Sequence, residues 1–184
     1  MLEGEFLASL RPRSAGLMEK ILTNGSSGIE RRNLALDSIS DSFGHGAEDL
    51  NRNFEREAPP LASEALRDAL QKSGHLATDV DALFICTCTG YLCPGVSSHV
   101  AEQAGLRHDV YLADLVGLGC GAAIPMLRAA QGFLAANPKA VVATVAVEIC
   151  SAAFFADDDP GVLISLCLFG DGAAAAIWTG EGSP

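Results

Sequence analysis

Cys120 is the residue whose surroundings best suit covalent chemistry. It lies in LVGLGCGAA, between an apolar run at 110–117 and a helical pattern that begins near Cys120 itself. The neighbouring glycines 117, 119 and 121 permit a sharp strand-to-helix turn that exposes a side chain at the carboxyl edge of a sheet. N–H groups at a helix start favour a thiolate, so the pattern suits a nucleophile. A structural cysteine in a tight turn is the alternative interpretation.

The other cysteines give weaker signals. Cys86, Cys88 and Cys93 form a Cys-x-Cys-x4-Cys array that resembles a metal site only superficially, with His99 as a distant fourth ligand. Structural zinc sites place paired cysteines on turns, whereas this array begins within a predicted buried strand, so we expect no metal. None of the four histidines has the pattern of a catalytic base. Small apolar packing positions are the simplest interpretation of the last two cysteines, Cys150 and Cys167.

These residues depend on an alternation of strands and helices. Short apolar runs predict strands at 82–87, 110–117, 140–148 and 173–179. Helical spacing of apolar residues predicts helices at 15–22, 59–74, 94–106 and 120–138, with a short one before LFGDG. Such alternation implies an α/β fold with a mainly parallel sheet covered on both faces. We expect an irregular or helical segment at 1–58, an α/β domain at 59–180 and a tail at 181–184.

Composition and charge limit the classes of partner. The chain has 184 residues and 49% hydrophobic content, enough for a buried core. Its formal net charge of -11 argues against a nucleic-acid partner. The amino terminus has no long apolar run, so we expect no membrane span, a cytoplasmic location and reduced thiols. The basic side chains gather in the first 32 residues, where ligand contact and solvated charge are both open: Arg11, Arg13, Lys20, Arg31 and Arg32.

Three motifs, read in order, resemble those of the type III polyketide synthases. They are CTCTGYLCPG at 86–95, GLGCGAAIPMLRAA at 117–130 and LFGDGAAAAI at 168–177. Ketoacyl-synthase III enzymes of fatty-acid synthesis share the third motif, so the resemblance rests on the combination. It implies a thiolase fold of two similar α/β halves, of which this chain is the N-terminal half, layered α/β/α with a mainly parallel sheet.

The resemblance also implies roles for individual residues. Cys120 matches the nucleophile that takes a starter acyl group from coenzyme A, before decarboxylated malonyl-CoA extends it by Claisen condensation. Phe169 matches the gatekeeper between the CoA tunnel and the reaction cavity, and Cys93 a residue that reaches into the partner's cavity across a dimer. Four further residues fall at cavity-lining positions: Cys88, Thr89, Cys150 and Ala153. Plant members carry threonines or serines at several of these positions, so this less polar set favours a long or apolar starter.

The same resemblance implies acyl-CoA and malonyl-CoA as substrates, no other cofactor, and a homodimer. The family's catalytic histidine and asparagine belong to its second half, so we expect this chain to be inactive alone and to self-associate through apolar surface. The family's first strand is also expected to be missing before residue 15. A ketoacyl-synthase III-like condensing enzyme and a non-catalytic remnant or binding module are the alternatives, although TGYLCPG and the helix after Cys120 favour the polyketide branch.

Overall fold

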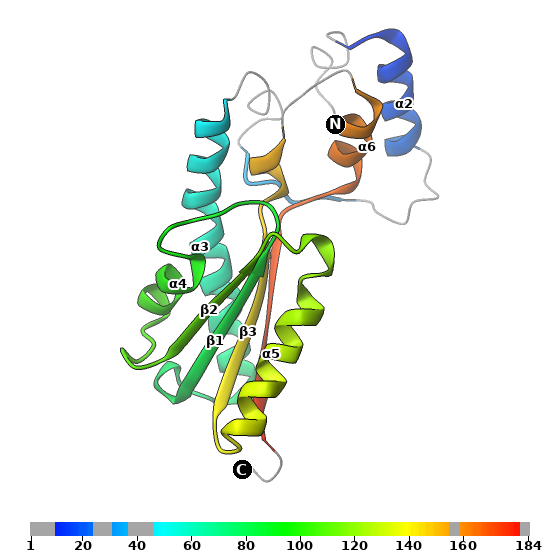
Figure 1. The fold of residues 1–184 in the computed structure, drawn as a ribbon. Helices are drawn as coiled ribbons and strands as arrows, with labels where there is room; N and C mark the ends of the chain where they lie inside the picture. The colour runs from blue at the N-terminus through cyan, green and yellow to red at the C-terminus, as the bar shows by residue number, and fades with distance from the viewer. Residues whose placement is uncertain (1–9, 24–30, 37–45, 155–158, 181–184) are drawn as a thin grey trace. The chain divides into compact units, whose positions relative to one another are not determined.

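A computed structural model describes residues 10–23, 31–36, 46–154 and 159–180 of the chain (Figure 1). The chain forms two compact units, which are described separately. Unit 1 comprises Met1–Asn53 and Ile149–Asp171, and unit 2 comprises Phe54–Glu148 and Gly172–Pro184. Compactness does not test whether a part folds alone, so the predicted domain limits at residues 58 and 180 stay a prediction.

Unit 2 is built on a four-stranded sheet of order β2-β1-β3-β4. β1 pairs in parallel with both β2 and β3, and β4 runs antiparallel to β3. The mainly parallel sheet expected from the sequence is therefore confirmed, as are the four strands: β1 (Val80–Thr87), β2 (Tyr111–Val116), β3 (Val141–Glu148) and β4 (Gly172–Thr179).

Burial along each strand follows its place in the sheet. Every residue of β1 except Asp81 is buried, because β1 has a neighbouring strand on each side and helices over both faces. β2 lies at an edge, and its residues are only partly buried, with Tyr111 52% exposed. The prediction that the 110–117 run forms a strand is thus confirmed, although this strand is less buried than β1.

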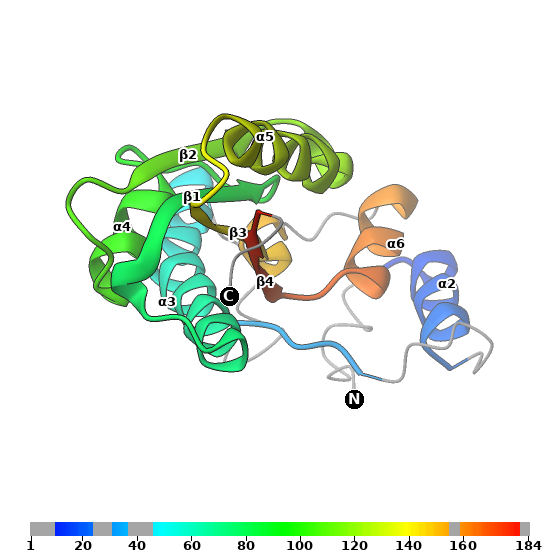
Figure 2. The same cartoon turned by 90° about the horizontal axis from the view of Figure 1, so that it is seen from below.

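Helices cover both faces of the sheet, which gives unit 2 the expected α/β/α layers. α5 (Ala123–Ala136) packs on one face, where Met126 and Ala130 join a core cluster with Phe84 of β1. α4 (Val96–Ala104) and the part of α3 (Ala47–Ser73) that lies in unit 2 cover the opposite face (Figure 2).

The predicted start of α3 at Pro59 is wrong, because the helix begins at Ala47 and continues through Pro59 and Pro60. A proline inside a helix removes a backbone hydrogen bond and costs about 3 kcal/mol. That penalty is offset by one continuous apolar face, whose members recur every four residues and are buried: Phe54, Ala58, Ala62, Leu66 and Leu70.

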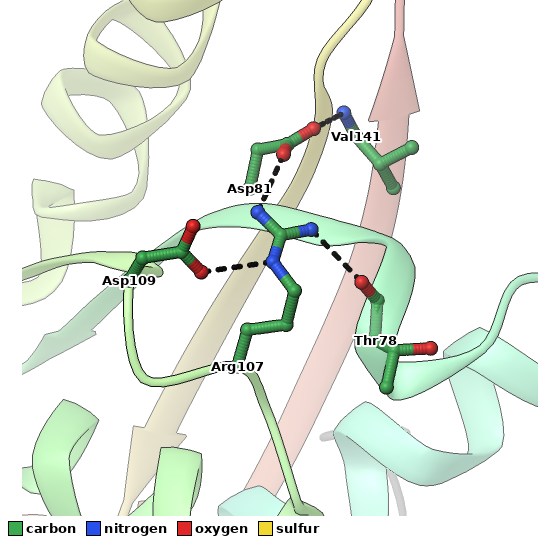
Figure 3. Close-up of polar contacts among 5 residues, drawn as sticks. All are labelled: Thr78, Asp81, Arg107, Asp109 and Val141. Atoms are coloured by element: carbon green, nitrogen blue, oxygen red, sulfur yellow. Dashed lines mark hydrogen bonds and ion pairs between the residues drawn. The ribbon is translucent and has the colours of Figure 1, made fainter.

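A charged cluster joins segments at the amino ends of the strands (Figure 3). Arg107 donates through Nε to Asp109 at 2.9 Å, through one terminal nitrogen to Asp81 at 2.9 Å, and through the other to the Thr78 carbonyl at 2.8 Å. Asp81 also accepts from the Val141 N–H at 2.9 Å. One guanidinium therefore fastens the start of β1, the loop before β2 and, through Asp81, the start of β3.

Unit 1 has its own small core. α2 (Pro12–Thr23), which confirms the helix predicted at 15–22, contacts α6 (Pro160–Leu168), and the buried side chains include Met18, Leu163 and Cys167. The Asp159 carboxylate caps α6 by accepting from the N–H groups of Gly161 and Val162. The predicted tail at 181–184 lies outside the described residues. In the part of the chain that is described, no helix is long and apolar enough to cross a membrane.

Candidate active site

The turn between β2 and α5 presents Cys120. Gly117 and Gly119 have φ angles of 73° and 66°, a left-handed conformation that residues with a Cβ rarely adopt. A short 3₁₀ turn, Gly119–Gly121, carries Cys120, and α5 begins at Ala123 rather than at the cysteine as predicted. The cysteine is exposed just ahead of the helix start. The predicted strand, glycine turn and helix are confirmed, whereas the thiolate state of Cys120 stays a prediction.

Glu148, the last residue of β3, organises the segment that follows β1. Both of its carboxylate oxygens accept from the Cys88 N–H at 3.0 Å. One of them also accepts from the hydroxyls of Thr87, at 3.2 Å, and Thr89, at 2.8 Å. The register that pairs Cys86 with Ala146 puts the carboxyl ends of β1 and β3 side by side, which brings Glu148 to residue 88.

Cys88 lies between Glu148 and Cys120. Its pKa is raised to about 12, first by burial of the thiol, then by a hydrogen bond to Glu148 and the charge of Glu148, and finally by the charge of Cys120 and a hydrogen bond to it. Cys86, two residues earlier, is buried in the core cluster beneath α5. Its pKa is also raised, chiefly by burial and then by the charge of Glu148. The structure therefore places Cys88 near Cys120, whereas the cavity-lining role of Cys88 stays a prediction.

The three members of the Cys-x-Cys-x4-Cys array lie in different environments. Cys86 is buried in the core cluster, whereas Cys88 and Cys93 are exposed. Among the described residues, no group of three or more His, Cys, Asp or Glu side chains is placed to hold a metal ion. Cys93 instead lines a small pocket of about 240 Å³ with Tyr91, Val96 and Asp114.

Unit 1 contains the remaining predicted site residues. Cys150 is half-buried and Ala153 exposed in the 3₁₀ turn Cys150–Ala153, and Phe169 is 45% exposed at the end of α6. The structure thus brings Cys88 to Cys120 within unit 2. The cavity-lining and gatekeeper roles of the three unit 1 residues stay predictions.

Asp171, in the motif LFGDG, holds three segments of unit 1 together. Its carboxylate accepts from the N–H and hydroxyl of Ser151, at 2.8 and 2.5 Å, and from the Ala35 N–H at 2.6 Å. Its own N–H donates to the Asn33 carbonyl at 2.7 Å. The aspartate of this motif therefore has a structural role: it fixes the turn that carries Cys150 and Ala153 against residues 33–35.

Comparison with known proteins decides the family. The family described as chalcone and stilbene synthases, N-terminal domain, matches residues 45–182. The chain belongs to this family. It is 35% identical over 161 residues to 3,5-dihydroxyphenylacetyl-CoA synthase of Streptomyces toyocaensis, which covers 85% of this chain and 41% of that protein. It is 34% identical over 160 residues to 1,3,6,8-tetrahydroxynaphthalene synthase of Streptomyces coelicolor, covering 85% and 42%.

Solved structures of related synthases share the fold. The crystal structure of 1,3,6,8-tetrahydroxynaphthalene synthase from Streptomyces coelicolor, a bacterial type III polyketide synthase, matches with a TM-score of 0.80 at 32% identity. The C-terminal type III polyketide synthase domain of Steely1 from Dictyostelium matches with a TM-score of 0.84 at 28% identity. Both cover 94% of this chain and 48% of the other. The chain therefore spans about half the length of the relatives it matches.

Glu148 is the part of this chalcone and stilbene synthase domain that the sequence analysis missed. Its signal was available, because it is a lone charged residue that ends the apolar run AVVATVAVE. A charged side chain at the carboxyl end of a buried parallel strand faces the same edge as the turn after the neighbouring strand. The pattern could therefore have placed a carboxylate near Cys120.

Proposed function

We propose that this chain supplies the acyl-accepting half of a type III polyketide synthase, with Cys120 as the nucleophile. The observation that carries the proposal is an exposed thiol on a glycine-framed turn ahead of α5, in a member of this synthase family. In the first step the thiolate attacks the carbonyl carbon of an acyl-CoA. The acyl C–S bond to coenzyme A breaks, and coenzyme A leaves as a thiolate that takes up a proton.

Chain extension is the second proposed step. Malonyl-CoA loses CO₂, and the resulting enolate attacks the acyl carbon on Cys120, which releases the cysteine thiolate and a β-ketoacyl-CoA two carbons longer. The enolate oxygen needs hydrogen-bond donors, which the family resemblance places on a histidine and an asparagine of the second half. CoA thioesters are the substrates, with no further cofactor. Loading of the starter on Cys120 is the step that we propose for the residues of this chain.

The remaining roles are proposed on the same basis. Phe169 is the gatekeeper of the CoA tunnel, and Cys93 reaches into the partner's cavity in a homodimer. Cys93 is exposed and Phe169 partly exposed, which supports contact of Phe169 with a substrate and of Cys93 with a second copy of the chain. The cavity is lined by Cys88, Thr89, Cys150 and Ala153, and its low polarity suits a long or apolar starter.

Mass spectrometry of the chain after incubation with octanoyl-CoA or acetyl-CoA tests the assignment. We expect one acyl group per chain, mapped to the peptide with Cys120, released by hydroxylamine as a thioester, and higher with octanoyl-CoA. Cys120→Ala should remove it, and the urea-unfolded chain, the matched control for non-specific transfer, should remain unlabelled. Addition of malonyl-CoA should give no longer product.

Three outcomes oppose the proposal. An acyl group that persists at the same level in Cys120→Ala would show that another residue is the acceptor. A folded chain that takes no acyl group from either thioester would favour the non-catalytic binding module. Loading from acyl-carrier protein alone would favour a ketoacyl-synthase III-like enzyme. The comparisons favour the polyketide branch instead, because both solved structures named above are type III polyketide synthases and one of the two relatives is the same tetrahydroxynaphthalene synthase.

A further inference from the structure

Two exposed thiols lie together at the carboxyl edge of the sheet, and the proposed acyl transfer uses only one of them. Cys88 follows β1 directly and Cys120 lies in the turn after β2, and the pairing of Thr87 with Val116 brings these two segments to the same edge of the sheet. An acyl-CoA that reaches Cys120 therefore comes close to a second thiol, that of Cys88. Since the thiolate is the attacking species, the ionisation of each thiol decides which sulfur takes the acyl group.

The carboxylate of Glu148 is held beside Cys88 by the hydrogen bonds of the flanking residues. The Cys88 N–H donates to both oxygens at 3.0 Å, while the hydroxyls of Thr87 and Thr89 donate to one of them. Thr87 is buried, so this end of the arrangement is fixed within the sheet. The carboxylate therefore has a defined position, next to one thiol of the pair.

A carboxylate at this position opposes negative charge on Cys88. Removal of the Cys88 proton would place a thiolate against Glu148, and would remove the S–H donor that bonds to it. The titratable groups that act on this thiol, among the described residues, are Glu148 from β3 and Cys120 from the turn before α5. Burial of the thiol raises its pKa most, and Glu148 and then Cys120 raise it further, to about 12.

We propose that Glu148 keeps Cys88 as a neutral thiol, so that of the two adjacent sulfurs only Cys120 accepts the acyl group. Glu148 is thus a positioning residue that acts through Cys88. This inference rests on the proposed function for its biological meaning, but thiol reactivity can be measured without any acyl transfer.

Alkylation with iodoacetamide across pH 7 to 10, followed by peptide mapping, measures each thiol separately. The chain is reduced first and the reductant removed, so that both cysteines begin as thiols. In the wild-type chain we expect Cys88 to react about tenfold or more slowly than the exposed Cys93 at pH 8, because one pKa unit changes the thiolate fraction about tenfold. Its rate should still be rising at pH 10.

Three variants separate charge from structure. Glu148→Gln should raise the Cys88 rate about tenfold at pH 8 and move its pH profile to lower pH, because the charge is removed while the side-chain shape is kept. Glu148→Asp keeps the charge and should leave Cys88 slow. Glu102→Gln, which neutralises an exposed carboxylate on α4, is the matched control and should change neither rate nor profile.

Each result has a clear consequence. Equal alkylation rates for Cys88 and Cys93 in the wild-type chain would overturn the proposal without any variant. So would a folded Glu148→Gln chain, verified by circular dichroism, whose Cys88 profile matches the wild type. In the acyl-CoA experiment, Glu148→Gln should shift part of the acyl group to Cys88. Absence of loading in both chains, with the alkylation results as expected, would count against the proposed function and leave the control of Cys88 by Glu148 supported.

Discussion

Gly119 precedes the nucleophile with a φ of 66°, and a Cβ built there would meet no atom within 4 Å. The difficulty for any other residue is therefore the left-handed backbone itself and not a lack of space. Gly132, inside α5, has equally open surroundings but lies within a regular helix. A comparison of the two glycines therefore tests whether backbone conformation, rather than lack of space, requires glycine near Cys120.

Replacement of each glycine by alanine should have opposite effects. Gly119→Ala should lower the free energy of unfolding by about 1 to 2 kcal/mol, because alanine is strained in the left-handed region. It should also slow acyl transfer to Cys120, whose turn is displaced. Gly132→Ala should raise the free energy of unfolding by about 0.5 to 1 kcal/mol, since alanine favours a helix. Urea titrations of the two variants check this pair, and equal effects would contradict it.

Residue types alone predicted part of the site. Cys120 and its glycines form a local pattern of five residues, so the sequence was sufficient to single out the turn. Glu148 was missed because its partner, Cys88, is 60 residues away along the chain, and only the pairing of β1 with β3 brings the two together.

Among the elements, the cluster around Arg107 links the amino ends of β1, β2 and β3. The pKa of Asp109 is lowered, chiefly by the hydrogen bond from Arg107 and then by the charge of that guanidinium. A carboxyl group whose pKa is lowered in the folded state stabilises the protein at pH values above its pKa in the unfolded chain, which is about 3.9. This stabilisation is lost as the pH falls through the lower folded value.

The thermal stability of the Asp109→Asn variant should show over which pH range this stabilisation acts. Its melting temperature should lie below that of the wild type at pH 7 and pH 5, and the difference should shrink below pH 4 as the wild-type carboxylate becomes protonated. Differential scanning calorimetry at pH 7, 5, 3 and 2 measures it. Asp68→Asn, which breaks an exposed pair with Lys72 on α3, is the control and should have a smaller effect. A difference that grows on acidification would refute the assignment.

At the scale of the whole molecule, unit 2 exposes large apolar side chains close to Cys120 in the sequence. Leu118 is 52% and Ile124 60% exposed, and Leu127 is 37% exposed. Burial of apolar surface yields about 25 cal/mol per Å², so such a patch favours association. We expected the chain to self-associate because the family resemblance implies a fold of two halves that meet through apolar surface.

Light scattering of the purified chain tests that expectation. We expect a mass above that of one chain, which falls toward the monomer in the double variant Leu118→Ser with Ile124→Ser. Leu76→Ser is the matched control, since Leu76 is 68% exposed but precedes β1, at the opposite end of the strand from residue 88, and should leave the mass unchanged. A stable, monodisperse wild-type monomer would refute the expectation.

The sequence by itself determined the strands, most of the helices and the turn that carries Cys120, because each of them depends on the types and spacing of neighbouring residues. Tertiary structure decided the start of α3, where burial of Phe54 and Ala58 outweighs the two prolines. It also decided the partners of Glu148 and of Asp171, which bonds to Ala35 across 136 residues. Contacts of that range depend on strand register and on how segments fold back on one another, and no local pattern contains either.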